Sequence, residues 1–248
     1  MTVYEKVFLS AKNGRAAHVV LLDPDKLTKE SAGDTASRCS KAGVDALFVG
    51  GSTASPELLN EIVYSIKENS SIPVILFPGG ADQIVKHADA ILFMSLLSGR
   101  NPRFLVEEPL KGVHLIRDYN IETIGMGYLL IESDKPSAVE RVSQTNPLPR
   151  SKPELAADHA LMAQYFGMKA VYLEGGSGVG LPVPLEMIQK VKEAISIPLI
   201  TGGGLRTPEA VTERVKCGAD IIVTGNVLEA KGTDTLLNEL VSAVHTAR

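Results

Sequence analysis

Acidic side chains follow two short apolar runs, at the places where strands would end. Glu174 comes directly after Val171–Leu173, and Asp23 follows His18–Leu22. A residue two positions earlier lies on the same face of a strand, so Tyr172 and Glu174 would face one space. A carboxylate held there can take a proton from a bound hydroxyl group. Glu174 and Tyr172 are therefore the candidate catalytic residues, and the alternative for Glu174 is an exposed rim position without a chemical role.

Glycine-rich turns follow the last three apolar runs of the chain. They are Gly175-Gly-Ser-Gly178, Gly202-Gly-Gly204 and Gly225-Asn226. Glycine lets backbone N–H groups approach an anion without a Cβ in the way, and the helix N-termini that follow add their positive dipole ends. One such turn could simply relieve crowding. Three of them at successive strand ends predict a binding site for one phosphate monoester.

The segment Asp23-Pro-Asp-Lys closes the first apolar run. Enzymes hold Mg²⁺ with one or two carboxylates together with phosphate oxygens of the substrate, which makes Asp23 a candidate metal ligand. Ser52, at the end of the second apolar run, could supply a further oxygen. Both segments also have structural interpretations, because Asp25 can cap a helix and Ser52 can form a turn.

Several other chemistries lack the residues that they need. No lysine stands at the end of an apolar run, where a Schiff-base nucleophile would lie, and no cysteine there has a neighbouring base. The segment Gly202-Gly-Gly-Leu is not a dinucleotide-binding fingerprint. The histidines do not have zinc-ligand spacing; they are His18, His87, His114, His159 and His245.

Eight short apolar runs alternate with longer stretches of helical period. The runs are too short for helices and rich in Val, Ile and Leu, as parallel strands buried on both faces are. Eight strands alternating with helices in 248 residues predict an α/β fold with a single domain, a TIM (β/α)₈ barrel; a doubly wound sheet is the alternative. The expected strands are His18–Leu22, Ala46–Val49, Val74–Phe77, Ala90–Met94, Thr123–Gly127, Ala170–Leu173, Leu199–Thr201 and Ile221–Thr224. The expected helices include Pro56–Lys67, Glu154–Phe166, Leu185–Ile195, Pro208–Lys216 and Thr235–His245.

An internal repeat supports a barrel. Ala46–Ser52 (ALFVGGS) resembles Val171–Ser177 (VYLEGGS), and Ser71-Ile-Pro73 recurs as Ser196-Ile-Pro198. Both pairs are separated by 125 residues, about half of the chain. The pattern indicates two related half-barrels, at about residues 1–125 and 126–248.

Two segments interrupt the alternation. Gly79–Asp89 leaves room for only one or two helical turns between the third and fourth strands. Ile131–Pro153 is polar and contains Pro136, Pro147 and Pro149. Because a long insertion on the strand-exit side of a barrel commonly carries function, we expect a loop without secondary structure that lies over the active site.

Composition excludes some partners and locations. The formal net charge is −4, with 25 basic and 29 acidic side chains, which argues against nucleic-acid binding through the net field of the protein. The apolar runs are far shorter than a membrane span, and the first ten residues do not resemble a secretion signal. Two cysteines cannot form a disulfide framework. These features predict a cytoplasmic protein.

The strand ends together resemble the geranylgeranylglyceryl phosphate synthase family, which includes bacterial heptaprenylglyceryl phosphate synthases. The matching segments span nearly the whole chain in the order of the family: LLDPDK, FVGGS, FMSLLSGRNP, GYLLIES, YLEGGSG, TGGGL and TGN. The resemblance implies a modified TIM barrel that lacks a full third helix. It also implies a prenyltransferase that joins sn-glycerol 1-phosphate to geranylgeranyl diphosphate, or to a similar allylic prenyl diphosphate, in the first ether bond of archaeal membrane phospholipids.

The resemblance also assigns site residues. It implies Mg²⁺ on Asp23 and Ser52, and a homo-oligomer, either a dimer or a hexamer. It places Tyr128 near the glyceryl or prenyl end of the site. The residues that it assigns to glycerol phosphate binding are Tyr172, Leu173, Glu174, Gly175, Gly176, Ser177 and Gly178, with Gly203, Gly204, Gly225 and Asn226 at the phosphate.

In the mechanism that this implies, Mg²⁺ favours departure of the diphosphate and Glu174 accepts the proton of the attacking glycerol hydroxyl. The prenyl chain needs an apolar groove, and Phe77, Met94, Leu96 and Leu97 are candidates for its lining or for the barrel core. A phosphate-binding barrel that isomerises or cleaves a phosphosugar is the alternative enzyme, and a non-catalytic phosphate-binding protein is a third hypothesis. Since the product belongs in a membrane, we expect peripheral contact with a bilayer surface.

Overall fold

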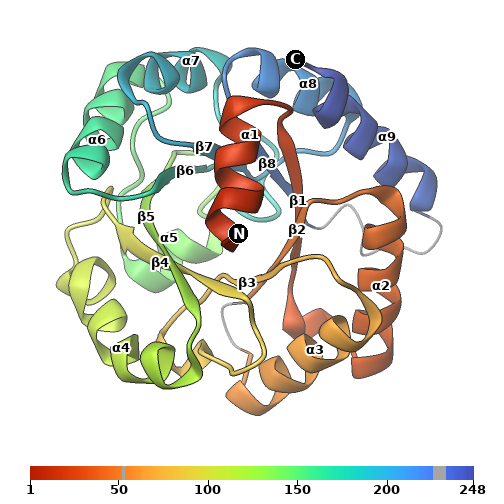
Figure 1. The fold of residues 1–248 in the computed structure, drawn as a ribbon. Coiled ribbons are helices and arrows are strands. Elements are labelled where there is room, and N and C mark those ends of the chain that lie inside the picture. Colours follow the sequence, from red (N-terminus) through yellow and green to blue (C-terminus); the bar gives the residue numbers. More distant parts are fainter. Residues whose placement is uncertain (52–53, 226–232) are drawn as a thin grey trace.

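The protein is a closed barrel of eight parallel strands ringed by helices (Figure 1). The computed structural model describes residues 1–51, 54–225 and 233–248. Each strand pairs with its neighbour in sequence, and the last pairs with the first. The strands are β1 Ala17–Leu22, β2 Ala46–Val49, β3 Val74–Leu76, β4 Ala90–Leu96, β5 Glu122–Leu130, β6 Ala170–Glu174, β7 Leu199–Gly202 and β8 Ile221–Thr224. All eight expected strands and the TIM-barrel class are confirmed.

The strands are apolar throughout because both of their faces are buried. Along β1, Val19 packs inside the barrel, in a cluster to which all eight strands contribute side chains. Val20 packs outside the barrel against helices. The outer layer consists of two clusters. One covers the outer faces of β1–β4 and the other covers those of β5–β8.

Helices return the chain to the start of the next strand after β1, β2, β4, β5, β6 and β7. Small polar side chains begin several of them: Ser55 accepts the Leu58 N–H group, and Thr207 accepts the Ala210 N–H group. Such caps satisfy N–H groups that have no partner within the helix. The helices are α2 Lys29–Ala42, α3 Pro56–Asn69, α4 Glu108–Tyr119, α5 Ala138–Ser143, α6 Pro153–Tyr165, α7 Leu185–Ala194, α8 Pro208–Lys216 and α9 Asp234–Thr246.

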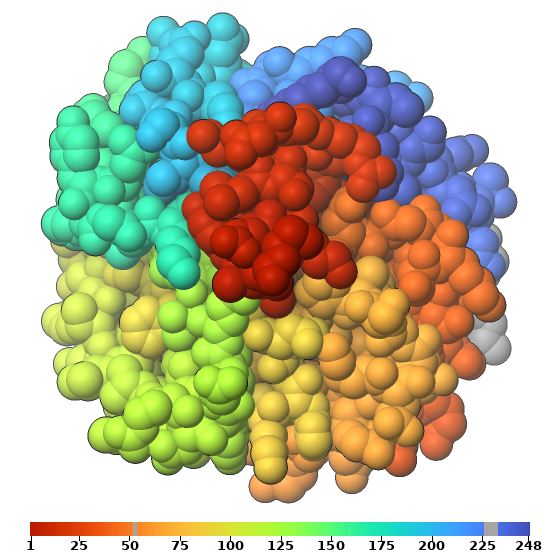
Figure 2. Space-filling model, in the orientation of Figure 1, coloured from red at the N-terminus to blue at the C-terminus, as the bar shows by residue number. Residues whose placement is uncertain are grey.

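An N-terminal helix closes the amino end of the barrel. It consists of a π-helical turn, Tyr4–Leu9, and the short helix α1, Ser10–Asn13. Phe8 is fully buried among the interior side chains, and the carboxylate of Glu122 accepts the N–H groups at the start of the turn. Figures 1 and 2 show this segment across the centre of that end of the molecule. The site can therefore open only at the opposite, carboxyl end.

The region after β3 has no full helix. Residues 77–89 contain one 3₁₀ turn, Ala81–Gln83, before β4 begins. The third helix of a TIM barrel is the one that follows β3, and the prediction that it is incomplete is therefore confirmed. A π-helical turn, Arg103–Glu107, then leads into α4, which lies beside the gap.

The segment 131–153 is more ordered than expected. Ile131 pairs with Leu148 as an isolated parallel bridge, and α5 lies between them. The expectation of a loop without secondary structure was wrong. Ser137 caps α5 by accepting the Glu140 N–H group at 3.1 Å, so a short capped helix forms in spite of the surrounding prolines.

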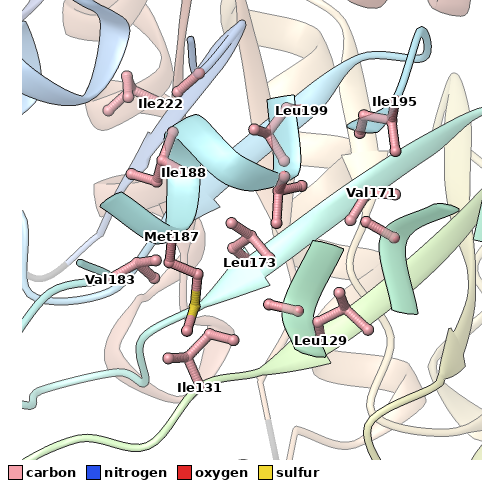
Figure 3. Close-up of a cluster of buried hydrophobic side chains, with 14 of the residues drawn as sticks. Leu129, Ile131, Val171, Leu173, Val183, Met187, Ile188, Ile195, Leu199 and Ile222 are labelled. Atoms are coloured by element: carbon pink, nitrogen blue, oxygen red, sulfur yellow. The ribbon is translucent and has the colours of Figure 1, made fainter. Parts of the chain in front are cut away.

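The outer cluster of the second half fixes β6, which carries the candidate catalytic residues. Figure 3 shows Leu173 and Val171 of β6 packed with Leu129, Ile188 and Leu199. Because side chains alternate along a strand, anchoring Leu173 on this outer side turns its neighbours Tyr172 and Glu174 toward the barrel axis. In the part of the chain that the structure describes, no helix is both long and apolar enough to cross a bilayer.

Candidate active site

A cavity of about 350 Å³ opens at the carboxyl ends of the strands. Its inner end lies over the barrel mouth, where Asp23, Glu174 and Gly204 contribute to the wall. Its outer end runs between the segment after β3 and helix α4. The cavity is therefore polar at the barrel mouth and apolar beside the segment after β3, which has no full helix.

Glu174 is a buried carboxylate at the end of β6. Only 6% of the residue is exposed, and its Oε1 atom accepts the N–H group of Gly176 at 2.5 Å. Burial raises the pKa of Glu174, while hydrogen bonds from Gly176, Tyr128 and Tyr172 oppose that rise. A carboxylate in this environment binds a proton more readily than an exposed one, as a general base requires.

Two tyrosines hydrogen-bond to Glu174, and their rings pack against that of a phenylalanine. The rings of Tyr128 and Tyr172 have centroids 5.3 Å apart, and Phe77 lies 5.8 Å from the first and 5.6 Å from the second. Burial raises the pKa of both tyrosines well above the ordinary value, and the nearby charge of Glu174 adds to the rise. Their hydroxyl groups therefore stay protonated and can donate to the carboxylate.

The glycine-rich turns after β6 and β7 lie against each other. Gly176, Gly203 and Gly204 have φ angles of 103°, 89° and 72°, in the left-handed region that favours glycine. A Cβ on Gly203 would lie 2.6 Å from the backbone nitrogen of Gly176. The two turns can approach this closely only without side chains, which supports the prediction of a backbone anion site.

The predicted substrate-binding residues do not all line the cavity. The structure places most of them in the cavity wall, whereas Leu173, Gly175 and Gly176 stand behind it. Leu173 points into the outer cluster (Figure 3). Asn226 lies outside the described residues. Those in the wall are Tyr128, Tyr172, Glu174, Ser177, Gly178, Gly203, Gly204 and Gly225.

Asp23 lies at the mouth beside a space that glycine keeps open. A Cβ on Gly51 would stand 2.7 Å from the Oδ1 atom of Asp23. The same oxygen accepts the Asp25 N–H group at 3.2 Å, and Lys26 lies 3.7 Å from the other oxygen. Among the described residues, no three His, Cys, Asp or Glu side chains gather into a metal cluster. Mg²⁺ needs no such cluster when substrate phosphates complete its shell, so this donor fits the ion; Ser52 lies outside the described residues.

The outer part of the cavity is an apolar groove. Its walls are the segment 77–84 with strand β4 on one side and helix α4 on the other, with α5 near the mouth. Phe77, Met94 and Leu96 line it as expected, but Leu97 does not, because it packs in the outer cluster of the second half.

Sequence reasoning missed several residues of the wall. Arg206 contributes a cation next to the glycine-rich turn, and its place directly after TGGGL was the available signal. Helices α4 and α5 contribute Glu108, Gly112 and Val139 to the wall. The sequence does not show these contributions, because they depend on how the two helices pack against the barrel.

The fold and the site define a class of protein: a (β/α)₈-barrel enzyme with glycine-rich turns, a buried carboxylate and an apolar groove at the carboxyl ends of its strands. The PcrB family model matches residues 11–244. The chain therefore belongs to the PcrB family. Its relatives are named geranylgeranylglyceryl phosphate synthases, which shows that it is a prenyltransferase.

Relatives and solved structures agree with this assignment. The chain is 52% identical over 217 residues to geranylgeranylglyceryl phosphate synthase of Thermococcus kodakarensis, covering 87% of this chain and 85% of the relative. It is 50% identical over 220 residues to the synthase of the same description from Pyrococcus abyssi, covering 88% and 86%. The crystal structure of (S)-3-O-geranylgeranylglyceryl phosphate synthase from Thermoplasma acidophilum, in complex with sn-glycerol-1-phosphate, has a TM-score of 0.94 and 35% identity over 99% of both chains.

Proposed function

We propose that the protein transfers a prenyl group from geranylgeranyl diphosphate, or a similar allylic diphosphate, to sn-glycerol 1-phosphate. The observation that carries the proposal is one continuous cavity that joins a glycine-rich anion site, a buried carboxylate and an apolar groove. Each part suits one part of the substrates. The solved relative that binds sn-glycerol-1-phosphate supports the choice of acceptor.

In the proposed reaction, the acceptor hydroxyl oxygen forms a bond to the allylic carbon and the bond from that carbon to diphosphate breaks. Glu174 takes the hydroxyl proton, and the diphosphate leaves with the electron pair of the broken bond. The glycine-rich turns hold the acceptor phosphate and so orient the hydroxyl group, an effect worth about 7–11 kcal/mol where the geometry is right. Tyr128 and Tyr172 hold the carboxylate in place, as their hydrogen bonds to Glu174 indicate.

Asp23, with Ser52 as a second candidate, is the proposed holder of Mg²⁺. The open space that Gly51 leaves beside the Asp23 carboxylate supports this choice. When bound, the ion would neutralise negative charge on the leaving diphosphate. Asp23→Asn keeps the size of the side chain and removes its charge, so we expect a higher Mg²⁺ requirement with unchanged folding.

The exposed apolar side chains beside the groove support the proposal that this cytoplasmic enzyme works at a membrane surface. Leu110 and Val113 are exposed on α4, and Val106 is exposed on the turn that precedes it. Val142, which lines the cavity, is exposed on α5. Apolar groups in such a rim can insert at the headgroup boundary. We expect wild-type protein to sediment with phosphatidylglycerol vesicles, and Leu110→Ser with Val113→Ser to weaken that sedimentation without changing activity on detergent-dispersed donor.

Self-association into a dimer or a hexamer is part of the proposal. Tyr165 and Phe166 are both exposed at the end of α6, and exposed aromatic pairs are typical of protein interfaces. Light scattering of the wild type and of a variant with serine at both positions tests whether this surface joins the subunits.

One assay tests the proposed reaction. Labelled sn-glycerol 1-phosphate is incubated with prenyl diphosphates of several lengths, with and without Mg²⁺, and the product is extracted into organic solvent. We expect labelled lipid with an allylic donor and Mg²⁺. A phosphosugar isomerase or lyase would use the anion site but leave the apolar groove without a role, and a binding protein would give no product with any donor.

A further inference from the structure

The apolar groove has one wall without a helix. The segment 77–84 follows β3, and its only regular structure is the 3₁₀ turn Ala81–Gln83. Within that turn, the Gln83 N–H group donates to the Gly80 carbonyl oxygen at 3.2 Å. A segment with so few hydrogen bonds of its own must be positioned by its neighbours.

The opposite wall, α4, approaches this segment closely. A Cβ on Gly112 would lie 2.5 Å from the Cδ1 atom of Ile84. Small relative movements of the two walls would therefore change the width of the groove. The contacts that fix the distance between the two walls therefore determine how well the groove fits an apolar chain.

Glu108, at the first position of α4, ties the two walls together. Its Oε2 atom accepts the Ala81 N–H group of the opposite wall at 3.1 Å. Its Oε1 atom accepts from Arg103 and from Lys111, each at 2.9 Å, on its own side. The Glu108 side chain is only 12% exposed, so its carboxylate is largely covered by the residues around it.

The Glu108 side chain remains a carboxylate at any working pH. Burial raises the pKa of Glu108, but hydrogen bonds from Lys111, the Ala81 N–H group and Arg103 outweigh burial and lower the pKa to about 2. Hydrogen bonds to a charged acceptor are stronger than those to a neutral one.

Gln83 ties the same turn to the barrel mouth. Its Oε1 atom accepts the Gly79 N–H group, and its Nε2 atom donates to the Gly51 carbonyl oxygen, both at 2.8 Å. The residue is only 3% exposed. Gly51 is the glycine whose backbone borders Asp23, so Gln83 connects the groove wall to the polar end of the cavity.

We propose that Gln83 and Glu108 are positioning residues for the prenyl donor: together they fix the 79–83 turn between the barrel mouth and α4, and so set the groove in which the prenyl chain lies. This inference rests on the proposed function and adds residues that act on the donor alone. The acceptor site lies on the turns after β6 and β7, to which neither side chain is hydrogen-bonded among the described residues.

The test compares Glu108→Ala, Glu108→Gln and Gln83→Ala with the wild type. Steady-state kinetics give the KM of each substrate and the relative kcat/KM for farnesyl, geranylgeranyl and longer donors. Loss of a hydrogen bond to a charged group predicts a donor KM about fivefold to tenfold higher in Glu108→Ala. We expect the acceptor KM to stay within about twofold and the donor-length preference to change. Glu108→Gln, whose amide oxygen can still accept the Ala81 N–H group, should fall between Glu108→Ala and the wild type.

Glu107→Ala is the matched control, because Glu107 is the adjacent exposed carboxylate and lies outside the cavity wall. It should leave both KM values and donor preference unchanged. The proposal is overturned if Glu108→Ala and Gln83→Ala raise both KM values equally, or leave donor preference as in the wild type. Melting temperatures identify variants that fail to fold. If Glu108→Ala does not fold, the donor KM and donor preference of Glu108→Gln decide the test in its place.

Failure of the proposed function would be recognised separately. If the wild type gives no product with any donor, calorimetric titration with geranylgeranyl diphosphate alone still measures donor binding. Weaker binding in Glu108→Ala, but not in Glu107→Ala, supports the positioning role without turnover. Equal binding in all variants, or no binding to the wild type, contradicts it.

Discussion

The segments after β3 and after β7 start from similar sequences and become different structures. Each strand follows a Ser-Ile-Pro segment, at Ser71–Pro73 and Ser196–Pro198, and each is followed by glycines. After β7 the chain forms the turn at Gly203 and then the capped helix α8. After β3 it forms only the turn Ala81–Gln83.

This difference divides the site into a polar part and an apolar part. The turn after β7 presents backbone groups and a helix N-terminus, which suit an anion. The incomplete segment after β3 uncovers the side of the barrel, and α4 stands across the gap, so that a groove remains. The lack of a full helix after β3 is therefore sufficient to add a long apolar groove to a barrel of this class.

The largest expected effect concerns the chemistry at the polar end. Glu174→Gln removes the proton acceptor while keeping the shape of the side chain, and we expect kcat to fall at least about 10²–10⁴-fold. Folding should survive, because a neutral amide is easier to bury than a carboxylate. Turnover is measured with the lipid-extraction assay and stability by thermal unfolding. A stable variant with wild-type turnover would remove Glu174 from the mechanism.

Gly203→Ala should damage acceptor binding selectively. Its φ of 89° and the 2.6 Å approach to the Gly176 nitrogen leave no room for a Cβ. Strain of this kind costs about 1–3 kcal/mol, so we expect a KM for sn-glycerol 1-phosphate at least about tenfold higher and a lower melting temperature. Titration with each substrate separately measures the selectivity. An acceptor KM unchanged in the folded variant would contradict a phosphate site at this turn.

Gly112→Ala is the corresponding change in the groove. The added Cβ would meet the flexible end of Ile84, which can move aside, and alanine favours the helix by about 0.8–1 kcal/mol over glycine. We therefore expect little loss of stability, a donor KM a few fold higher and a preference for shorter donors. The acceptor KM should not change. A donor preference equal to that of the wild type would show that the chain does not pass between Gly112 and Ile84.

The strands and the glycine-rich turns could be predicted because their signals are local. A buried parallel strand is apolar at every position, and a glycine-rich turn at its end is visible without knowledge of the fold. Even the incomplete third helix was apparent, because too few residues separate β3 from β4. Ser137 with Glu140 had the S-x-x-E pattern of a helix start, but the nearby prolines led to the wrong expectation for α5.

Other parts of the site depend on contacts between distant segments. Glu108 has the sequence context of an ordinary exposed glutamate at a helix start, and only the approach of Ala81 gives it a partner on the other wall of the groove. Gln83 likewise gains its role from Gly51, 32 residues away. No periodicity or motif identifies such pairs, because the partner is chosen by the packing of elements and not by spacing in the chain. The roles assigned to the site residues stay predictions, those of Glu174 and Tyr172 as well as those of Asp23, Ser52 and Asn226.

The smallest expected effect is a shift in pH dependence from Tyr128→Phe. The Tyr128 hydroxyl group stabilises the charged form of Glu174 and so lowers its pKa against the rise caused by burial. Removing it should raise the pKa of Glu174. Because a base must be ionised, activity is lost as the pH falls through that pKa, and the acid limb of kcat/KM should move upward by about half to one pH unit. Tyr64→Phe, at an exposed position of α3 outside the cavity wall, is the control that should leave the profile unchanged. A limb that stays in place or moves downward in Tyr128→Phe would mean that the hydroxyl group does not stabilise the base, and the polar end of the cavity would then depend on Tyr172 and the Gly176 N–H group alone.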